Sequence, residues 1–452
     1  MTWHVVGRAG PRDPFSLELR PTDQMIEVPF DDPGHPQTLE STISKLLADH
    51  GLRPSISAED FLRAAITAYV ADVRISRGVA FDGWTRDIVL YVPMREPERW
   101  SETHATFEQL LSFLTGDRWQ MVVRPAPPGY RPYRLAPRRS RRRPRRVHRL
   151  SADVVSLFSG GLDSYIGVID QLERNDRVVL VGHHGSGNGP TSVAQTESLA
   201  ALRKYYDEAA APFLHVWLTS PIGVKGASEI TTRARSILFM ALGAFFADSL
   251  NAQQLVVPEN GWISLNVPLT LSRIGSFSTR TTHPYLMELL RQVLAQLGLT
   301  IEVVLPYRFQ TKGEMVSACV NQEILMTGLP STMSCAHPAA GRFAGGRNPN
   351  QHCGRCLPCF VRRAAIIASR SDPTSYTWEN AAMPLTTTTA ADLKAVKIAL
   401  DRYAGRSPRL TDVLQSGPLP GSSTELQAYL DVFRRGLGEL RAFLASVGAQ
   451  EQ

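Results

Sequence analysis

The sequence has no apolar stretch that approaches a membrane span, which takes about 20 residues. Its longest apolar stretch, residues 237–247, predicts a buried helix instead. The first residues, MTWHVVGRAGPRDP, lack the basic start and the apolar segment of a secretory signal peptide. We therefore expect a cytoplasmic protein with no membrane partner.

Cysteine is also scarce, with five in 452 residues. Four of them lie between Cys335 and Cys359, which is not the dispersed framework of a disulfide-rich domain. In a reducing compartment such a cluster indicates a metal site. The fifth, Cys319, lies in an apolar helical pattern and is expected to be a buried thiol.

Hydrophobic residues make up 43% of the chain, which is enough for a sizeable core, and the length suggests about two to three domains. We predict an N-terminal α+β domain over residues 1–130 that binds a partner or covers the next domain. An Arg-rich linker over residues 131–150, an α/β domain over residues 151–371 and a helical C-terminal extension over residues 372–452 follow. In the first domain, strands are expected near residues 16–19, 25–30, 88–92 and 120–123, and in the extension helices are expected over residues 391–403 and 426–447.

The net charge of +7 is unevenly distributed, because ten arginines lie between Arg131 and Arg149. Prolines in the same segment prevent regular helix or sheet. A charge run of this kind is ordinarily a solvated, extended segment. A site for nucleic acid or for an acidic partner surface stays open as the alternative. Few aromatic residues are present to stack on bases.

From residue 152 short apolar segments alternate with helical ones. We predict strands over residues 154–158, 178–181, 213–218, 254–257 and 301–305, and helices over residues 162–173, 192–206, 232–250 and 285–297. This alternation predicts a doubly wound parallel sheet with helices on both faces. Ligands of such sheets bind outside the carboxyl ends of the strands.

The first of these strands leads into a glycine-containing turn at the start of a helical pattern. The turn consists of Ser159, Gly160, Gly161, Leu162, Asp163 and Ser164. The glycines allow a ligand to approach the backbone closely, and free N–H groups at the start of a helix favour an anion. The two serines add hydroxyl donors, and Asp163 is a candidate magnesium ligand or cap of the turn. We predict a phosphate-binding loop that is not of the Walker type, since no GK[ST] sequence follows.

Other polar residues are expected at the same rim, and one group, residues 258–261, follows the fourth strand. His183, after the second strand, is a candidate nucleotide contact, although histidines at strand ends more often have a structural role. Arg233 and Arg235 begin a helix, where a cation opposes the helix dipole, and this suggests an anion nearby. Lys312 also opens a helical segment and is a candidate phosphate ligand.

The metal site is predicted from Cys335 and from a C-x2-C-x2-C motif made of Cys353, Cys356 and Cys359. Four thiolates at these spacings predict a closed tetrahedral zinc site with a structural role. An iron–sulfur cluster also uses four thiolates and stays an alternative. His337 or His352 in place of Cys335 is a second alternative.

The SGGLDS loop and the later cysteine motif, in this order, resemble the 7-cyano-7-deazaguanine synthase (QueC) family of PP-loop ATP pyrophosphatases over about residues 152–371. The N-terminal domain and the segments PENG (258–261) and RTTHP (280–284) are most similar to the QueC-like component of the Qat anti-phage defence systems. The resemblance implies an adenine-nucleotide alpha-hydrolase-like, PP-loop fold. It also implies an ATP-dependent C–N ligase with ATP, Mg²⁺ and Zn²⁺ as cofactors.

In this family the carboxylate of 7-carboxy-7-deazaguanine attacks the α-phosphate of ATP, pyrophosphate leaves, and an amine then displaces AMP to give an amide. A second activation gives the nitrile in the synthases. By resemblance, the catalytic residues are Asp163, Ser164, Arg235 and Lys312, and residues 159–164 with His183 bind the nucleotide. No glutaminase-like domain is visible to supply ammonia, so an amine of a protein partner from a defence operon is a candidate acceptor.

The chain departs from the synthases in two places. The gap between Cys335 and Cys353 is longer, and Glu259-Asn260-Gly261-Trp262 replaces the segment that usually follows the fourth strand. Two other functions stay open. One is a tRNA-modifying adenylase whose arginine run binds RNA. The other is a zinc-bearing scaffold that senses ATP without cleaving it.

Overall fold

The computed structural model describes residues 1–133, 147–185, 189–219, 229, 233–270, 280–338, 340, 350–367, 371–378 and 390–449. Residues 134–146, which hold most of the arginine run, lie outside the described residues, so the prediction of a polyanion site there stays a prediction.

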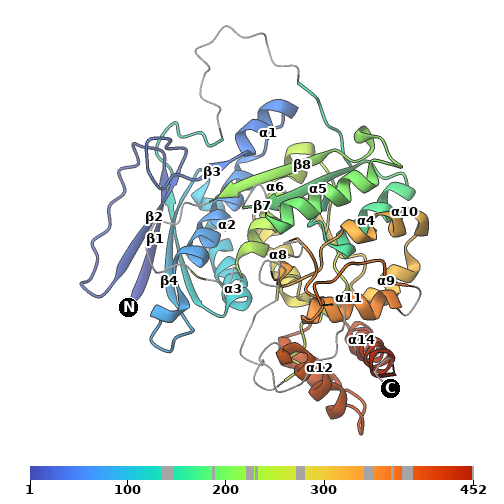
Figure 1. The fold of residues 1–452 in the computed structure, drawn as a ribbon. Coiled ribbons are helices and arrows are strands. Elements are labelled where there is room, and N and C mark those ends of the chain that lie inside the picture. The colour runs from blue at the N-terminus through green and yellow to red at the C-terminus, as the bar shows by residue number, and fades with distance from the viewer. Residues whose placement is uncertain are drawn as a thin grey trace.

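The α/β domain is built on a six-stranded sheet with the order β10-β9-β6-β7-β8-β3. The neighbouring strands β7 and β8 of this sheet are labelled in Figure 1. Its parallel strands are β6 (Val154–Leu157), β7 (Val178–His184), β8 (Phe213–Thr219), β9 (Gln254–Val256) and β10 (Glu302–Val304). The helices between them are α4 (Leu162–Glu173), α5 (Pro190–Leu202), α6 (Arg235–Leu250), α7 (Gly261–Leu265) and α8 (Pro284–Gln296). Every residue of β6 and β7 is buried, as expected for strands covered on both faces. The predicted parallel sheet is confirmed.

The order of the strands defines where a ligand would bind. The chain passes from β6 to β7 and β8 on one side, and then crosses to β9 and β10 on the other. The strands β6 and β9 therefore flank a topological switch point, and the loops after these two strands face a common crevice.

The N-terminal region forms a second sheet of β2 (Gln24–Phe30), β1 (Thr2–Ala9), β4 (Asp87–Met94) and β5 (Arg118–Pro125) in this order. Each neighbouring pair is parallel, which is an α/β arrangement and not the predicted α+β one. No strand lies at residues 16–19, where the sequence pattern predicted one. The strand β1, in contrast, was not predicted from the sequence.

The two sheets share one core. Helices α2 (Ile56–Arg74) and α3 (Thr103–Thr115) lie on the N-terminal sheet and pack against α6 and α8. A single buried apolar cluster includes residues of both sheets and of these four helices. In addition, β3 (Glu40–Ser41), which precedes α1 (Ile43–His50), pairs antiparallel with β8. The other face of the six-stranded sheet packs on α4, α5, α9 (Lys312–Ala318) and α10 (Gln322–Gly328) through a second cluster.

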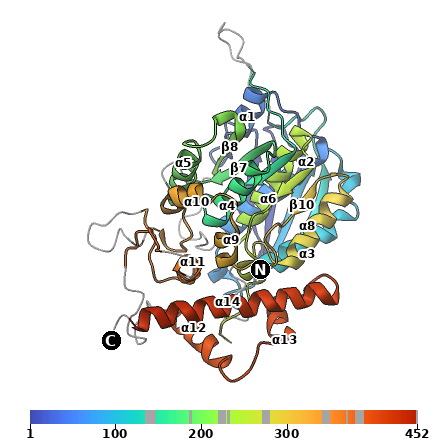
Figure 2. The ribbon, with the colours of Figure 1, turned by 90° about the vertical axis from the view of Figure 1, so that its right-hand side faces the viewer.

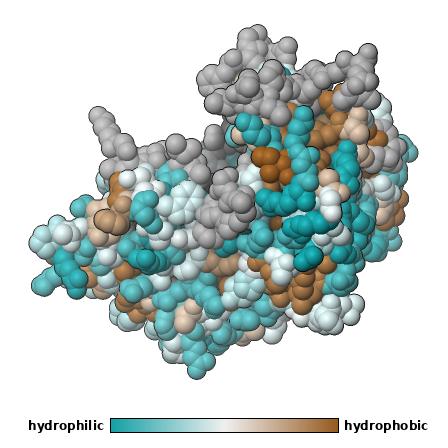
Figure 3. Space-filling view, turned by 90° about the horizontal axis from the view of Figure 1, so that it is seen from below, coloured by the Kyte–Doolittle hydropathy of each residue, from teal (hydrophilic) through white to brown (hydrophobic). Residues whose placement is uncertain are grey.

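The C-terminal helices form a further layer (Figure 2). Helix α14 (Ser423–Ala449) lies beneath α9 and α11 (Leu357–Ile367), and α12 (Ala391–Arg402) and α13 (Leu410–Val413) lie on its far side. The helices predicted in this extension are confirmed. Seen from below, the surface is mainly hydrophilic with separate hydrophobic patches (Figure 3). In the described part of the chain, no helix combines the length and the apolar character that a membrane crossing requires.

Candidate functional site

The SGGLDS turn connects β6 to α4, whose N-cap is Gly161. Gly160 has a positive φ of 78°, and a Cβ atom there would lie 2.7 Å from the backbone nitrogen of Gln195. Only glycine fits this position without a shift of the backbone. Ser159 Oγ accepts from the Gly161 N–H at 3.2 Å, and the Ser164 hydroxyl donates to the Gly161 carbonyl at 2.9 Å. Both hydroxyl groups are therefore held within the turn.

The segment that leads to the cysteine cluster lies across this turn. The Met333 N–H donates to the Gly160 carbonyl at 2.8 Å, and the Leu162 N–H contacts Ser334 Oγ at 3.4 Å. The Ser334 N–H in turn donates to His352 Nε2 at 3.0 Å. The turn and the cysteine cluster are thus connected by a short chain of hydrogen bonds.

Asp163 is the centre of a buried polar network at the switch point. Its Oδ1 pairs with the Lys312 ammonium, and its Oδ2 accepts from the backbone nitrogen of Asn260 at 3.2 Å and from its side-chain nitrogen at 2.7 Å. Burial raises the pKa of Asp163, but the Lys312 charge and the hydrogen bonds outweigh it and lower the pKa below its usual value. Burial and the neighbouring Asp163 charge raise the pKa of Glu259 well above its usual value. The pair of carboxyl groups therefore favours a charged Asp163 beside Lys312 and disfavours a second charge on Glu259.

This network does not fit a direct magnesium ligand at Asp163. Both carboxylate oxygens already accept hydrogen bonds, and a lysine ammonium adjoins one of them. Asp163 and Lys312 are only 5% and 6% exposed, so neither presents a free charged group to solvent. The second predicted role, a cap of the turn, does not fit either, because the carboxylate bonds to Lys312 and Asn260 and no side chain caps the start of α4.

A cavity of about 380 Å³ lies at the rim of the sheet, beside the turn. Its polar lining includes Ser159, Ser164, His183, Arg235 and Glu259, and its apolar wall includes Leu157, Phe239 and Met240. The structure therefore brings together the serines of the turn, the predicted histidine and one predicted arginine. Lys312 does not line this cavity, because its ammonium group points to Asp163.

His183 is 2% exposed, and its ring nitrogens make no close hydrogen bond in the described part of the chain beyond a loose contact with the Leu218 backbone. Burial, together with the charge of Arg235, lowers its pKa to about 3, so the ring is neutral. The ring packs edge-on against Tyr69 of α2 at 6.0 Å between centroids. A neutral imidazole whose polar atoms are not both firmly hydrogen-bonded, at the wall of a cavity, is suited to bind a ligand.

Arg233 and Arg235 have different surroundings. Arg235 donates to the His183 carbonyl at 3.3 Å, and among the described residues no carboxylate pairs with it. Arg233 donates to the Thr115 carbonyl at 2.8 Å and stacks over Trp84 at 4.5 Å. The prediction of an anion nearby also holds for Arg233, but there the anions are the carboxylates of Asp72 and Asp117, which join the start of α6 to the N-terminal region. Of the two arginines, Arg235 is the one that lines the cavity.

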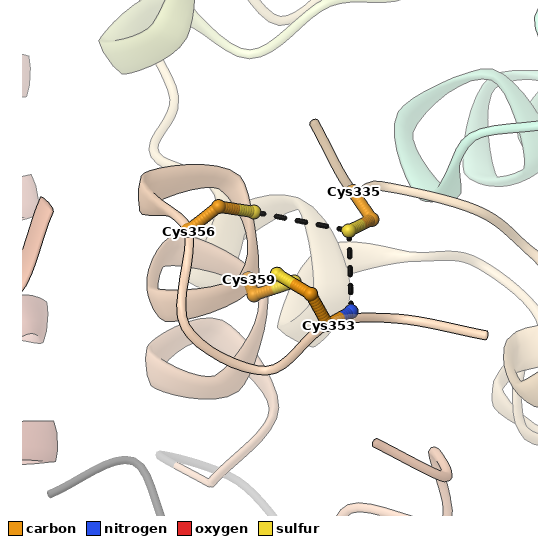
Figure 4. Close-up of side chains that lie close together, drawn as sticks. All are labelled: Cys335, Cys353, Cys356 and Cys359. Atoms are coloured by element: carbon orange, nitrogen blue, oxygen red, sulfur yellow. Dashed lines mark hydrogen bonds between the residues drawn. The ribbon is translucent and has the colours of Figure 1, made fainter. Parts of the chain in front are cut away.

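The four predicted cysteines converge on one point (Figure 4). Their sulfur atoms all lie within 4.8 Å of one another. The Cys335–Cys356 and Cys353–Cys359 sulfur pairs are each 3.9 Å apart. A zinc ion bonded to four thiolates at about 2.3 Å holds them roughly 3.8 Å apart, so these residues fit a single tetrahedral ion. A multinuclear iron–sulfur core lies between its thiolates and needs wider spacing, so the single ion fits better.

The surroundings of the sulfurs also suit a metal. Backbone N–H groups donate to all four, for example from Cys353 to Cys335 Sγ at 3.2 Å and from Gly354 to Cys359 Sγ at 3.4 Å. Such donors stabilise thiolates. His352 is not the fourth ligand here, because its Nε2 accepts the Ser334 N–H. The four cysteines could hold a metal such as zinc, and with all four positions filled by protein the ion would be structural.

The fold and the site together define an α/β protein with a polar rim cavity at its switch point and a tetracysteine cluster beside it. No protein-family model matches the chain, and no curated protein matches its sequence.

Two residues that contact Asp163 were predicted from the sequence only as members of a polar segment, without a role of their own. Glu259 and Asn260 follow a predicted strand, which is a usable signal, but nothing in the sequence shows that both would contact Asp163. Glu439, which contacts the segment around Lys312, lies in an ordinary amphipathic helix and gave no signal at all.

Proposed function

We propose that this protein is an ATP-dependent C–N ligase of the PP-loop type. In this proposal it adenylates the carboxylate of a 7-deazaguanine acid, 7-carboxy-7-deazaguanine, and transfers the acyl group to an amine. The observation that carries the proposal is the position of the SGGLDS turn. It begins a helix at the switch point, and its serines line the same cavity as Arg235 and His183.

The proposed chemistry needs little from the protein beyond alignment and charge neutralisation. The nucleotide phosphates would lie on the turn, against the N-terminus of α4. A carboxylate oxygen of the acid attacks the α-phosphorus, and the bond to the bridging oxygen breaks as pyrophosphate leaves. The amine nitrogen then attacks the acyl carbon, AMP leaves, and the nitrogen releases a proton. Arg235 is placed to neutralise the anionic groups in the cavity.

Magnesium enters this proposal only as the ion that accompanies the nucleotide, and we assign it no protein ligand. In this proposal the zinc site holds the segment of Met333 and Ser334, which lies across the SGGLDS turn and hydrogen-bonds to it. We propose that the acceptor is an amine of a partner protein, such as its N-terminus, and that the reaction serves anti-phage defence. A deazapurine mass adduct on a co-expressed partner is the expected product, and its absence from every partner tested would contradict this acceptor.

The first experiment is pyrophosphate release from ATP by the purified protein, with and without 7-carboxy-7-deazaguanine. The test variant is Gly160→Ala, because its Cβ would collide with the backbone of α5. The matched control is Gly405→Ala, since a Cβ there meets no atom within 4 Å. We expect release that needs the deazapurine acid, falls more than about tenfold in Gly160→Ala and is unchanged in the control. Release that depends on tRNA instead would favour the tRNA-modifying alternative, and ATP binding without any release would favour the sensor.

A further inference from the structure

Helix α14 contacts both segments that supply the partners of Asp163, although it is remote in sequence from either. Its Gly436 lies against Trp262 of α7, and a Cβ atom at residue 436 would lie 2.0 Å from Trp262 Cδ1. Trp262 follows Asn260, which donates to Asp163. The close approach fixes the end of the loop that carries Asn260.

On the same helix, Glu439 contacts the residues on both sides of Lys312. Its carboxylate accepts from the Thr311 hydroxyl and, at 3.3 Å, from the Gly313 N–H. Thr311 is the N-cap of α9 and accepts the Glu314 N–H at 3.1 Å, so its only hydroxyl proton goes to Glu439. The absence of a side chain at Gly313 makes room, since a Cβ there would lie 2.5 Å from Glu439 Oε1.

A second contact, one turn earlier on α14, holds the same region. The Arg435 guanidinium donates to Glu314 Oε1 at 2.5 Å and to the Phe309 carbonyl at 2.9 Å. Arg435 and Glu439 lie four residues apart and thus on one face of the helix. That face is directed at the start of α9, where Lys312 begins the helix and reaches Asp163.

We propose that Glu439 is a positioning residue of the active site, which holds the first turn of α9 so that Lys312 stays paired with Asp163. The C-terminal extension is then a working part of the site and not an appendage. The effect on catalysis rests on the function proposed above, whereas the effect on Lys312 does not.

Two readouts test this inference. The first is the rate at which acetic anhydride modifies Lys312, followed by mass spectrometry of the full chain. In the unchanged protein Lys312 is 6% exposed and paired, so its labelling is slow. We expect Glu439→Ala to increase the labelling rate roughly tenfold, because one hydrogen bond to a charged group is lost on each side of Lys312. We expect Glu439→Gln to give an intermediate rate. The control is Glu425→Gln on the same helix, whose carboxylate contacts Arg308 and Ser422 instead.

The second readout is the split between kcat and KM in pyrophosphate release. We expect kcat to fall about tenfold in Glu439→Ala, with a change in the KM for ATP below about twofold. Unchanged labelling of Lys312 in Glu439→Ala would overturn the inference, and so would a rise in KM alone. If the unchanged protein releases no pyrophosphate, the proposed function fails, while the labelling experiment still decides the role of Glu439.

Discussion

Asn260 donates two hydrogen bonds to one oxygen of Asp163, from its backbone nitrogen and from its side-chain nitrogen. Asp163 follows β6 and Asn260 follows β9, the two strands that flank the switch point. The two loops that flank the switch point are therefore joined by these hydrogen bonds. Ser164 and Glu259, the chain neighbours of Asp163 and Asn260, both line the rim cavity, so these hydrogen bonds lie directly behind its wall.

The Lys312–Asp163 pair gives the first prediction. Because both groups are buried, Lys312→Met leaves an uncompensated charge and should lower the free energy of unfolding by about 3–5 kcal/mol. Adding Asp163→Asn should recover much of that loss, since the charge is then removed. Urea denaturation measures both. The control is Arg177→Met, which breaks an exposed pair with Asp153 and should cost less than about 1 kcal/mol. If Lys312→Met and Arg177→Met lowered the free energy of unfolding equally, the prediction of a buried ion pair would be contradicted.

The tetracysteine cluster predicts a metal content of about one zinc ion per chain. Cys353→Ser should abolish that content and lower the thermal unfolding temperature. Cys319→Ser, which changes the remaining cysteine, should leave the content unchanged, because Cys319 lies in a separate buried cluster. Elemental analysis of the purified proteins measures the ratio. Loss of zinc from Cys319→Ser, or its retention in Cys353→Ser, would contradict the assignment.

The hydrogen bonds between the cluster and the turn give a third prediction. Removal of the metal by a chelator should speed amide hydrogen exchange at Met333 and Ser334, because their N–H groups are bonded to Gly160 and to His352 beside the cluster. Amides in the middle of α12 should exchange at their former rate. Hydrogen exchange with mass spectrometry measures both regions. Uniform acceleration through the whole chain would indicate global unfolding and would contradict a local connection.

The sequence predicted the parts of this site that depend on local pattern. The strands of the parallel sheet, the turn from Ser159 to Ser164 and the four clustered cysteines each have a signature within a few residues. Sequence order also placed the polar loops at one rim, because the carboxyl ends of parallel strands share an edge.

The remaining features depend on contacts between distant segments. The strand Thr2–Ala9 was missed because its alternation is weak, and its partners lie tens of residues away. Lys312 was expected to face a phosphate, but 149 positions separate it from the carboxylate that it contacts. The contact of Glu439 with Thr311 spans 128 positions. Pattern within a short window carries no information on such pairs, because only packing decides them.

The last prediction concerns the dependence of stability on pH. His283 is fully buried at the N-cap of α8, where its Nδ1 accepts the Tyr285 N–H, and its Nε2 lies 3.1 Å from Ser416 Oγ. Burial, with the nearby charge of Arg280, lowers its pKa to about 3. In the unfolded chain a histidine has a pKa of about 6.5, so below that pH only the unfolded state binds the proton.

The stability that neutral His283 contributes is therefore complete above about pH 6.5 and is lost as the pH falls toward 3. At about 1.4 kcal/mol per pH unit, this one group lowers the free energy of unfolding by about 2 kcal/mol between pH 7 and pH 5. His283→Asn keeps an acceptor for the helix cap but does not titrate, so the difference between the two pH values should shrink by that amount. Urea denaturation at both pH values measures it. An unchanged difference in the variant would show that His283 takes up a proton in the folded protein.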